Sequence, residues 1–291
     1  MRVLVTGCNG YVGSHLVKNL SDHGHEVYGV DCRATTNKEI ISSRLSSYRE
    51  TFFEHVRYKE TFDAVFHLAA YVSVVESVSC PLSYVNNNGV VNFHFLSNVK
   101  TEKFVLASTQ AVSNITSPYA ISKVLAENIL ENAKDIPYRI SARFSNVAGS
   151  DGVCRETHSS HLIKVAAETA AGKREELVIF GDDYQTLDGT CVRDYVHVSD
   201  VTDALMRIAG TKIAPGYSIE NICSGKNFSN REIATEMKIA SGKDFKVRYG
   251  KRREGDPSHF ETKFPSAFCN TTQRTIQDMC LSTYEMETKN G

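Results

Sequence analysis

Tyr119 and Lys123 lie four residues apart in the run SPYAISK, so in a helix their side chains would share one face. A tyrosine titrates near ~10, and its use as a base near neutrality requires its pKa to fall by about three, equivalent to ~4 kcal/mol. A positive charge about 4 Å away supplies roughly that much at an effective dielectric near ~20. Such a pair also arises by chance in many helices, so the elements around it decide whether it does chemistry.

The first fifteen residues, MRVLVTGCNGYVGSH, have the order strand, glycine turn, helix. Arg2 to Thr6 reads as a short buried strand, and Gly7, Gly10 and Gly13 follow with the spacing GxxGxxG. The pattern becomes helical from about Tyr11. This order directs a helix N-terminus at a pyrophosphate and therefore predicts a dinucleotide site.

An acidic residue ends the second predicted strand, Glu26 to Val30. Asp31 comes 18 residues after Gly13, where a carboxylate can accept hydrogen bonds from the ribose hydroxyls of the adenosine half. The same carboxylate would repel a 2′-phosphate, so the sequence predicts NAD as the cofactor. Arg33 leaves NADP open, because a guanidinium there could accept that phosphate.

Apolar strands alternate with helical stretches along the first half of the chain, as a parallel sheet covered on both faces requires. We therefore predict an α/β fold with a Rossmann-like doubly wound parallel sheet and a smaller C-terminal α/β lobe. The remaining strands are expected at Ala64 to Leu68, Phe104 to Ala107 and Tyr138 to Ala142, and helices at Ser83 to Val99 and Tyr119 to Ala133.

The strand–helix rhythm breaks at Gly149, after which the chain reads as a loop-rich half. The predicted domains are an NAD-binding Rossmann domain at 1–149, with a return segment near 190–212, and a substrate-binding lobe made of 150–189 and 213–291. A second lobe of this kind would close over the cofactor.

Composition describes an ordinary globular protein of 291 residues, with 33 basic and 34 acidic side chains. This balance favours neither nucleic acid nor an acidic membrane surface. Nothing reads as a signal peptide, no apolar run approaches a membrane span of ~20 residues, and the eight cysteines are scattered singly. We expect a cytoplasmic protein with reduced thiols. His158, His161 and His197 fit no compact ligand set, so no metal site is predicted.

Five motifs occur in order along the chain: TGCNGYVGSH, HLAA, the Tyr-x-x-x-Lys pair, VIFGDDYQTLDGTCVRDYVHVSDV and RREGDP. Together they resemble the UDP-glucose 4-epimerase (UDP-galactose 4-epimerase) family of extended short-chain dehydrogenase/reductases. The match covers nearly the whole length and is most specific from Val178 to Val201. It implies NAD-dependent epimerisation of UDP-glucose and UDP-galactose at C4 through a transient 4-keto sugar. It also implies a homodimer formed through the helices predicted at 83–99 and 119–133.

The resemblance assigns roles to individual residues. Tyr119 is the base that takes the proton of the sugar 4-hydroxyl. Lys123 lowers the pKa of Tyr119 and binds the nicotinamide ribose, and Thr109 is hydrogen-bonded to the reacting oxygen. The implied NAD-binding residues are Gly7, Gly10, Tyr11, Val12, Gly13, Asp31, Leu68, Ala70, Asn87, Tyr119, Lys123 and Phe144.

Substrate contacts follow from the same resemblance. Asn146 meets the diphosphate, Arg253 binds phosphate, and Asp256 binds the nucleotide ribose. The positions that hold uridine and phosphates are Leu162, Phe180, Arg193 and Tyr195. Two arginines suit a diphosphate, because a guanidinium can bind it bidentately.

Departures from the family pattern keep two alternatives open. The segment between Asp31 and Asp63 and the loop before Tyr119 are shorter than usual, which would suit a non-catalytic NAD-binding relative. A sugar-nucleotide 4,6-dehydratase would carry an acid pair directly after the catalytic threonine. Gln110 and Ala111 stand there instead, so the proton donor for dehydration is missing.

The resemblance also places Phe260 near the 2-position of the sugar, where a large ring leaves little room. UDP-glucose and UDP-galactose are therefore expected to be good substrates and N-acetylated UDP-sugars poor ones. We expect Phe260→Ser to raise kcat/KM for UDP-N-acetylgalactosamine selectively, measured against UDP-galactose. Equal kcat/KM on the two sugars in the wild type would contradict this assignment.

Overall fold

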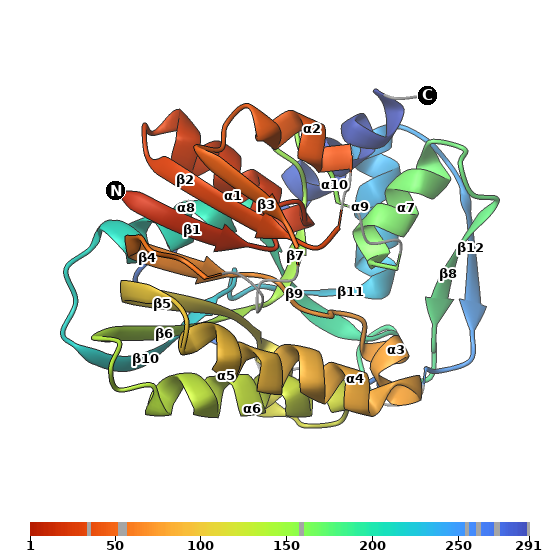
Figure 1. Cartoon of the computed structure of the whole chain (residues 1–291). Coiled ribbons are helices and arrows are strands. Elements are labelled where there is room, and N and C mark those ends of the chain that lie inside the picture. The colour runs from red at the N-terminus through yellow and green to blue at the C-terminus, as the bar shows by residue number, and fades with distance from the viewer. Residues whose placement is uncertain are drawn as a thin grey trace. The chain divides into compact units, whose positions relative to one another are not determined.

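The computed structural model describes residues 1–33, 36–51, 57–156, 160–253, 256–259, 263–270 and 274–289. Residue contacts divide the chain into two units (Figure 1). Unit 1 comprises Met1–Phe144 and Thr202–Asn221, and unit 2 comprises Ser145–Val201 and Ile222–Gly291. The segment that returns to the first unit thus begins at Thr202, later than the 190–212 expected from the sequence.

Unit 1 is built on a seven-stranded sheet of order β10-β6-β5-β4-β1-β2-β3. The pairs from β3 across to β6 are all parallel, which confirms the doubly wound α/β prediction. The strands are β1 Arg2–Thr6, β2 Glu26–Asp31, β3 Ser47–Glu50, β4 Thr61–His67, β5 Lys100–Thr109, β6 Tyr138–Phe144 and β10 Gly216–Ile222.

Helices cover both faces of this sheet, with α5 and α6 below it and α1 and α8 above it in Figure 1. The sheet face below is filled by a cluster that includes Phe62, Val65 and Phe104, on which Ala126 and Leu130 of α6 pack. The helices are α1 Tyr11–Asp22, α2 Thr36–Ser42, α3 Val74–Ser79, α4 Pro81–Val85, α5 Val91–Leu96, α6 Pro118–Asn132 and α8 Val198–Gly210.

The helix expected from Ser83 to Val99 is divided into three parts in the structure. A π-helical turn, Asn86–Val90, separates α4 from α5. Gly89 in this turn approaches α6 so closely that a Cβ atom there would lie 2.5 Å from Leu125 Cδ2. Single π-turns inside helices are frequent at functional sites, and this one turns an asparagine toward α6, as described below.

A buried lysine fixes the end of α8 to the sheet. The Nζ atom of Lys103, on β5, donates to the carbonyl oxygens of Ile208, Ala209 and Thr211 at 2.6–2.9 Å. These carbonyls lie at the C-terminus of the helix, where a cation interacts favourably with the helix dipole.

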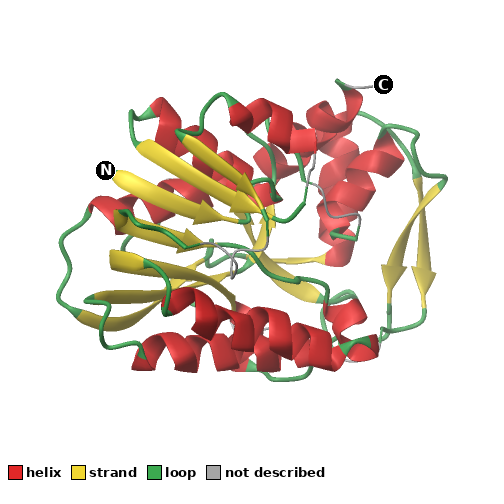
Figure 2. Cartoon of the chain, in the orientation of Figure 1, coloured by secondary structure: helices red, strands yellow, loops and turns green. Residues whose placement is uncertain are grey.

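Unit 2 is richer in regular structure than the loop-rich half expected from the sequence (Figure 2). The expectation was wrong in part because a strand such as β11 Asn227–Ser229 is too short to show a periodicity; β7 Asn146–Ala148, equally short, comes just before that half. Both flank β9 Val192–His197 in a three-stranded sheet, and β8 Glu176–Phe180 pairs parallel with β12 Lys246–Gly250. The long helices are α7 Leu162–Ala170, α9 Asn230–Ser241 and α10 Ile276–Thr288.

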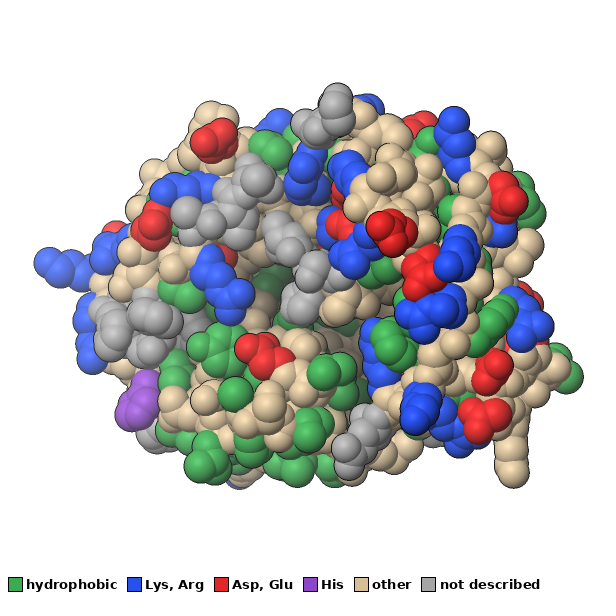
Figure 3. Space-filling model, turned by 90° about the vertical axis from the view of Figure 1, so that its right-hand side faces the viewer, with side chains coloured by type: hydrophobic (Ala, Val, Ile, Leu, Met, Phe, Trp, Pro, Cys, Tyr) green, Lys and Arg blue, Asp and Glu red, His purple; other side chains and the backbone are tan. Residues whose placement is uncertain are grey.

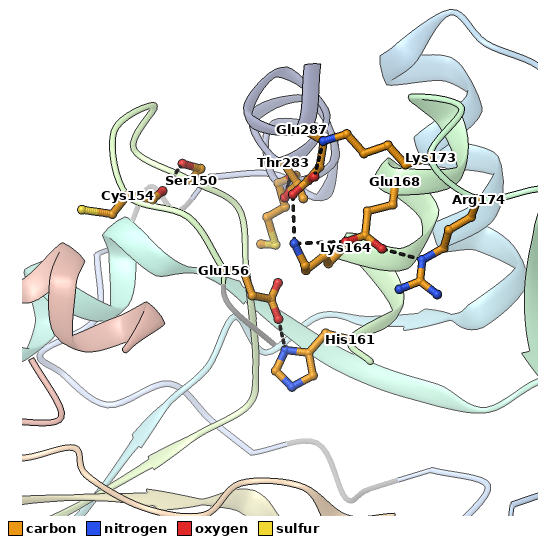
Figure 4. Close-up of polar contacts among 11 residues, drawn as sticks. Ser150, Cys154, Glu156, His161, Lys164, Glu168, Lys173, Arg174, Thr283 and Glu287 are labelled. Atoms are coloured by element: carbon orange, nitrogen blue, oxygen red, sulfur yellow. Dashed lines mark hydrogen bonds and ion pairs between the residues drawn. The ribbon is translucent and has the colours of Figure 1, made fainter. Parts of the chain in front are cut away.

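A buried ion-pair network joins α7 to α10 in unit 2 (Figure 4). Lys164 Nζ lies 2.9 Å from a carboxylate oxygen of Glu287 and 3.2 Å from one of Glu168, and Lys173 Nζ lies 2.9 Å from the other oxygen of Glu287. Because each charge is paired, the network offsets part of the cost of burying it. It fixes the last helix against the core of unit 2.

The eight cysteines all lie in the described ranges, and none of them forms a disulfide. Over the ranges described above, no helix has both the length and the apolar character needed to cross a membrane.

Candidate active site

The carboxyl ends of the unit 1 strands carry most residues of the predicted dinucleotide site. From β1 the sheet continues with β2 and β3 on one side, and from β4 it continues with β5, β6 and β10 on the other. The strand order therefore reverses between β1 and β4, and ligands of doubly wound sheets bind at such a switch point. Gly7 follows β1, Asp31 ends β2, Leu68 and Ala70 follow β4, and Phe144 ends β6.

The glycine turn after β1 has no room for side chains. Gly7 has φ +69°, and a Cβ there would lie 2.8 Å from the backbone nitrogen of Ala69; a Cβ at Gly13 would lie 2.0 Å from Gly7 O. The turn leads into α1, whose N-cap is Gly10 and whose first turn, beginning with Tyr11 and Val12, holds no acidic residue. Close backbone approach and an electropositive helix end fit the pyrophosphate of a dinucleotide.

Asp31 is held by backbone donors on both of its oxygens. It accepts from the amide N–H of Asn9 at 2.9 Å and from that of Arg33 at 3.0 Å. Burial raises the pKa of Asp31, and these backbone hydrogen bonds oppose that effect. The guanidinium of Arg33 lies over the ring of Tyr71, 5.7 Å from its centroid. Asp31 is thus held in a fixed orientation at the carboxyl end of β2.

Tyr119, on α6, has its phenol near the side chain of Thr109 at the end of β5. Burial raises the pKa of Tyr119 to about 12, and the Thr109 side chain opposes the rise. The edge of the buried Tyr84 ring packs against it, with the centroids 6.4 Å apart at 87°. The sequence expected a lowered pKa here, and in the structure desolvation outweighs the neighbouring groups.

Lys123 is almost fully buried, with 4% of its surface exposed, and its Nζ donates to the carbonyl oxygen of Ala107 at 2.9 Å. Burial lowers the pKa of Lys123 to about 8, while the charge of Glu127 opposes the change. An ammonium that has lost its water and has one carbonyl partner keeps donors for further hydroxyl groups.

The π-helical turn contains a buried residue that sequence reasoning missed. Asn88 accepts from the Tyr71 N–H at 2.8 Å and donates to Tyr71 O at 2.9 Å and to the Ser122 hydroxyl at 3.0 Å. Its amide therefore joins the loop after β4 to α6. Asn87, the residue predicted to bind NAD, is half-buried and donates to Asn88 at 2.9 Å. Three asparagines in a row gave no signal as to which one faces inward.

Apart from Thr109 and Tyr119, the predicted substrate residues belong to unit 2. Among these, Arg193 and Asp256 form an ion pair. Arg193 also donates to the carbonyl oxygens of Pro257 at 2.7 Å and Val192 at 2.8 Å. This arginine is 8% exposed. Its guanidinium is therefore pre-oriented by four residues of unit 2, including Ser258 at 3.3 Å.

The other predicted substrate residues of unit 2 lie on separate elements. The guanidinium of Arg253 stacks on the ring of Phe180, 3.9 Å from its centroid, and Asn146 donates to Asp194 O at 3.2 Å. Leu162 is the first residue of α7. Tyr195 is buried in the hydrophobic core, and Phe260 lies outside the described residues.

Two of the three histidines considered for a metal lie in the described ranges, and each has a protein partner. His161 pairs with Glu156 (Figure 4), and His197 accepts from the Ser199 N–H at 3.1 Å. His158 lies outside those ranges. Where the structure is described, no group of three or more His, Cys, Asp or Glu side chains could hold a metal ion.

The fold and the Tyr119–Lys123 site together define a nucleotide-dependent enzyme of the short-chain dehydrogenase/reductase type. Residues 3–223 match the family model described as "NAD dependent epimerase/dehydratase family". The chain belongs to this family.

Curated relatives and solved structures agree with that assignment. The chain is 34% identical to UDP-glucose 4-epimerase of Lacticaseibacillus casei over 288 residues, covering 89% of this chain and 87% of the relative. It is 33% identical to the same enzyme of Azospirillum brasilense, over 88% and 82%. The crystal structure of UDP-glucose 4-epimerase from Bifidobacterium longum in complex with NAD+ and UDP has a TM-score of 0.90 at 26% identity, over 100% and 99% of the two chains.

The Asp31 geometry yields a prediction about cofactor choice. Titration of the apo-protein should show NAD binding at least about tenfold tighter than NADP, because the fixed carboxylate repels a 2′-phosphate. Asp31→Ala should remove most of this preference, and Arg33→Ala should leave NAD affinity unchanged. Burial raises the pKa of Asp31, so its carboxylate is neutralised at a less acidic pH than usual. The preference for NAD over NADP should therefore weaken as the pH is lowered into the acidic range. Tighter binding of NADP by the wild type would show the assignment to be wrong.

Proposed function

We propose that this protein is an NAD-dependent UDP-glucose 4-epimerase that interconverts UDP-glucose and UDP-galactose at C4. The observation that carries the proposal is the cluster of Thr109, Tyr119 and Lys123 at the end of β5, in the same unit as the glycine turn. The family assignment and the named relatives support it.

The residues of this chain move a single proton to and from the 4-oxygen of the sugar. Tyr119 Oη takes the proton of the sugar 4-hydroxyl and later returns it. Thr109 hydrogen-bonds to Tyr119, and the buried ammonium of Lys123 donates to a ribose hydroxyl and favours the phenolate. NAD, when bound, supplies reversible hydride acceptance and a positively charged ring. Because burial alone raises the pKa of Tyr119 to about 12, the base is expected to form only in the loaded enzyme.

The substrate role of unit 2 is to hold the nucleotide diphosphate. Arg193 and Arg253 are the cations for the two phosphates, and Asp256 is the carboxylate for the uridine ribose. The pairing of Arg193 with Asp256 fixes both groups before binding, which lowers the entropy cost of ordering them. Asn146 contacts the diphosphate.

Two observations argue against the alternative functions, a sugar-nucleotide 4,6-dehydratase and a non-catalytic NAD-binding relative. A dehydratase needs an acid after Thr109, and that place is held by Gln110, whose side chain is buried. A non-catalytic relative would have no use for a lysine buried beside a tyrosine, since desolvating an ammonium costs stability.

The homodimer is proposed on an exposed apolar surface of unit 1, the α3–α6 patch. Figure 3 shows hydrophobic side chains gathered on the lower part of one face, where α3 and α4 lie. A patch of this kind marks an interaction site. A second copy is its proposed occupant because α6 and part of α4, with the exposed Val90 and Ile121, fall in the ranges expected to dimerise. Its exposed members are Val72, Val74, Val75, Val78, Leu82, Val90, Ile115 and Ile121.

The reaction predicts that purified protein converts UDP-galactose into UDP-glucose without added cofactor, because NAD co-purifies. Tyr119→Phe keeps the ring and removes the proton acceptor, so it should lose at least about a hundredfold in kcat while binding NAD as before. Lys123→Ala should lose turnover and NAD affinity together. Tyr249→Phe, on an exposed strand of unit 2, is the matched control and should keep wild-type rates. More than about a tenth of the wild-type rate in Tyr119→Phe, a loss under ~1.4 kcal/mol, would make another residue the base.

The α3–α6 patch predicts the mass in solution. Light scattering after size exclusion should give twice the chain mass for the wild type and the single-chain mass for Leu82→Asp, because a carboxylate there cannot be desolvated in the interface. Leu187→Asp changes a leucine of unit 2 that is even more exposed than Leu82 and should leave the dimer intact. A dimer that survives Leu82→Asp together with Val78→Asp would place the interface elsewhere.

A further inference from the structure

The catalytic pair belongs to a longer row of side chains on α6. Tyr119, Lys123 and Glu127 are spaced four residues apart, so they lie along one face of the helix. Figure 1 shows α6 running beside β5 and β6. The three side chains meet three consecutive residues at the end of β5, Ala107, Ser108 and Thr109.

Glu127 is the member of this row without a role so far. It is 5% exposed, and its Oε1 accepts from the Ser108 hydroxyl at 2.5 Å and from Arg143 Nε at 2.9 Å. Its Oε2 accepts from Arg143 Nη2 at 2.6 Å. Ser108 and Arg143 are register partners on β5 and β6, so one carboxylate joins α6 to both strands through a bidentate pair.

The charged and titratable groups around Lys123 come from several elements. His67, on β4, is buried, and its pKa is lowered to about 3 by burial first and by the charge of Lys123 second. On α6 the neighbours are Tyr119 and Glu127, and Glu127 is the carboxylate whose charge favours the ammonium. Arg143 on β6 forms an ion pair with Glu127, and the charges of both act on Tyr217 of β10.

We propose that Glu127 is a positioning residue of the active site, which holds α6 in register on β5 and keeps the buried Lys123 side chain charged. The proposal rests on the function proposed above for Tyr119 and Lys123. A carboxylate whose charge is fully neutralised by Arg143 would tie α6 to the strands but would not alter the protonation of Lys123. The two cases therefore differ in a measurable quantity.

The direct test is the titration of Lys123 in the full chain, followed by NMR of protein with ¹³C-labelled lysine. Lys123→Arg assigns the signal. Glu127→Gln keeps the size and the acceptor for Ser108 but has no charge, so the proton affinity of Lys123 should fall about tenfold or more, a drop of one in pKa. Ser108→Ala removes a hydrogen bond and keeps the charge, so Lys123 should titrate as in the wild type.

A second variant keeps the test decisive if Glu127→Gln does not fold. Arg143→Gln removes the cation that neutralises Glu127, so the proton affinity of Lys123 should rise instead of fall. An unchanged Lys123 titration in either folded charge variant overturns the proposal.

Activity provides the second readout. The alkaline limb of kcat for UDP-galactose reports loss of the Lys123 proton, so in Glu127→Gln it should move to lower pH by about one unit, with KM unchanged. Glu127→Asp, which keeps the charge, should restore the limb. If the wild type does not epimerise UDP-galactose at all, the proposed function fails, while the NMR titration still decides the role of Glu127.

Discussion

The arrangement of this protein depends on an ammonium group that is held out of water and kept charged. Lys123 is nearly fully buried, which by itself favours the neutral amine. The end of β5 offers a carbonyl oxygen to its Nζ atom, and Glu127 supplies the opposing charge from the next turn of α6. The groups that stabilise this buried charge therefore come from the sheet and from α6.

The same strand ends provide the dinucleotide site. The glycine turn lets the backbone of α1 come within contact distance of the loop after β4, so that a phosphate can approach the helix end. Asn88 joins that loop to α6 by its amide. The loop after β4 and α6 are therefore linked by one buried side chain, and the proposed reaction needs such a link because it requires near-contact geometry between proton and hydride positions.

Unit 2 also holds cationic side chains away from water, and it stabilises them through different contacts. Arg193 is buried and would be costly there alone, but Asp256 and three backbone carbonyls satisfy its donors. Arg253 instead stacks on an aromatic ring, a contact that leaves the edge of the guanidinium available for hydrogen bonds. Both arginines are oriented by protein groups before any anion binds.

The sequence by itself determined the parallel sheet, the glycine turn, the acid after β2 and the Tyr119–Lys123 pair, because each follows from spacing within a few residues or from a steric demand that glycine alone meets. Tertiary structure decided the rest. The direction of the Tyr119 pKa, the choice of Asn88 over Asn87 and the link from Glu127 to Arg143 depend on burial and on partners distant in the chain. Strands of three residues, such as β7, likewise form only because a partner strand lies beside them. Sequence periodicity predicts which face of a helix or strand is buried. Only the folded chain determines which residues pack on that face and how far they exclude water from it.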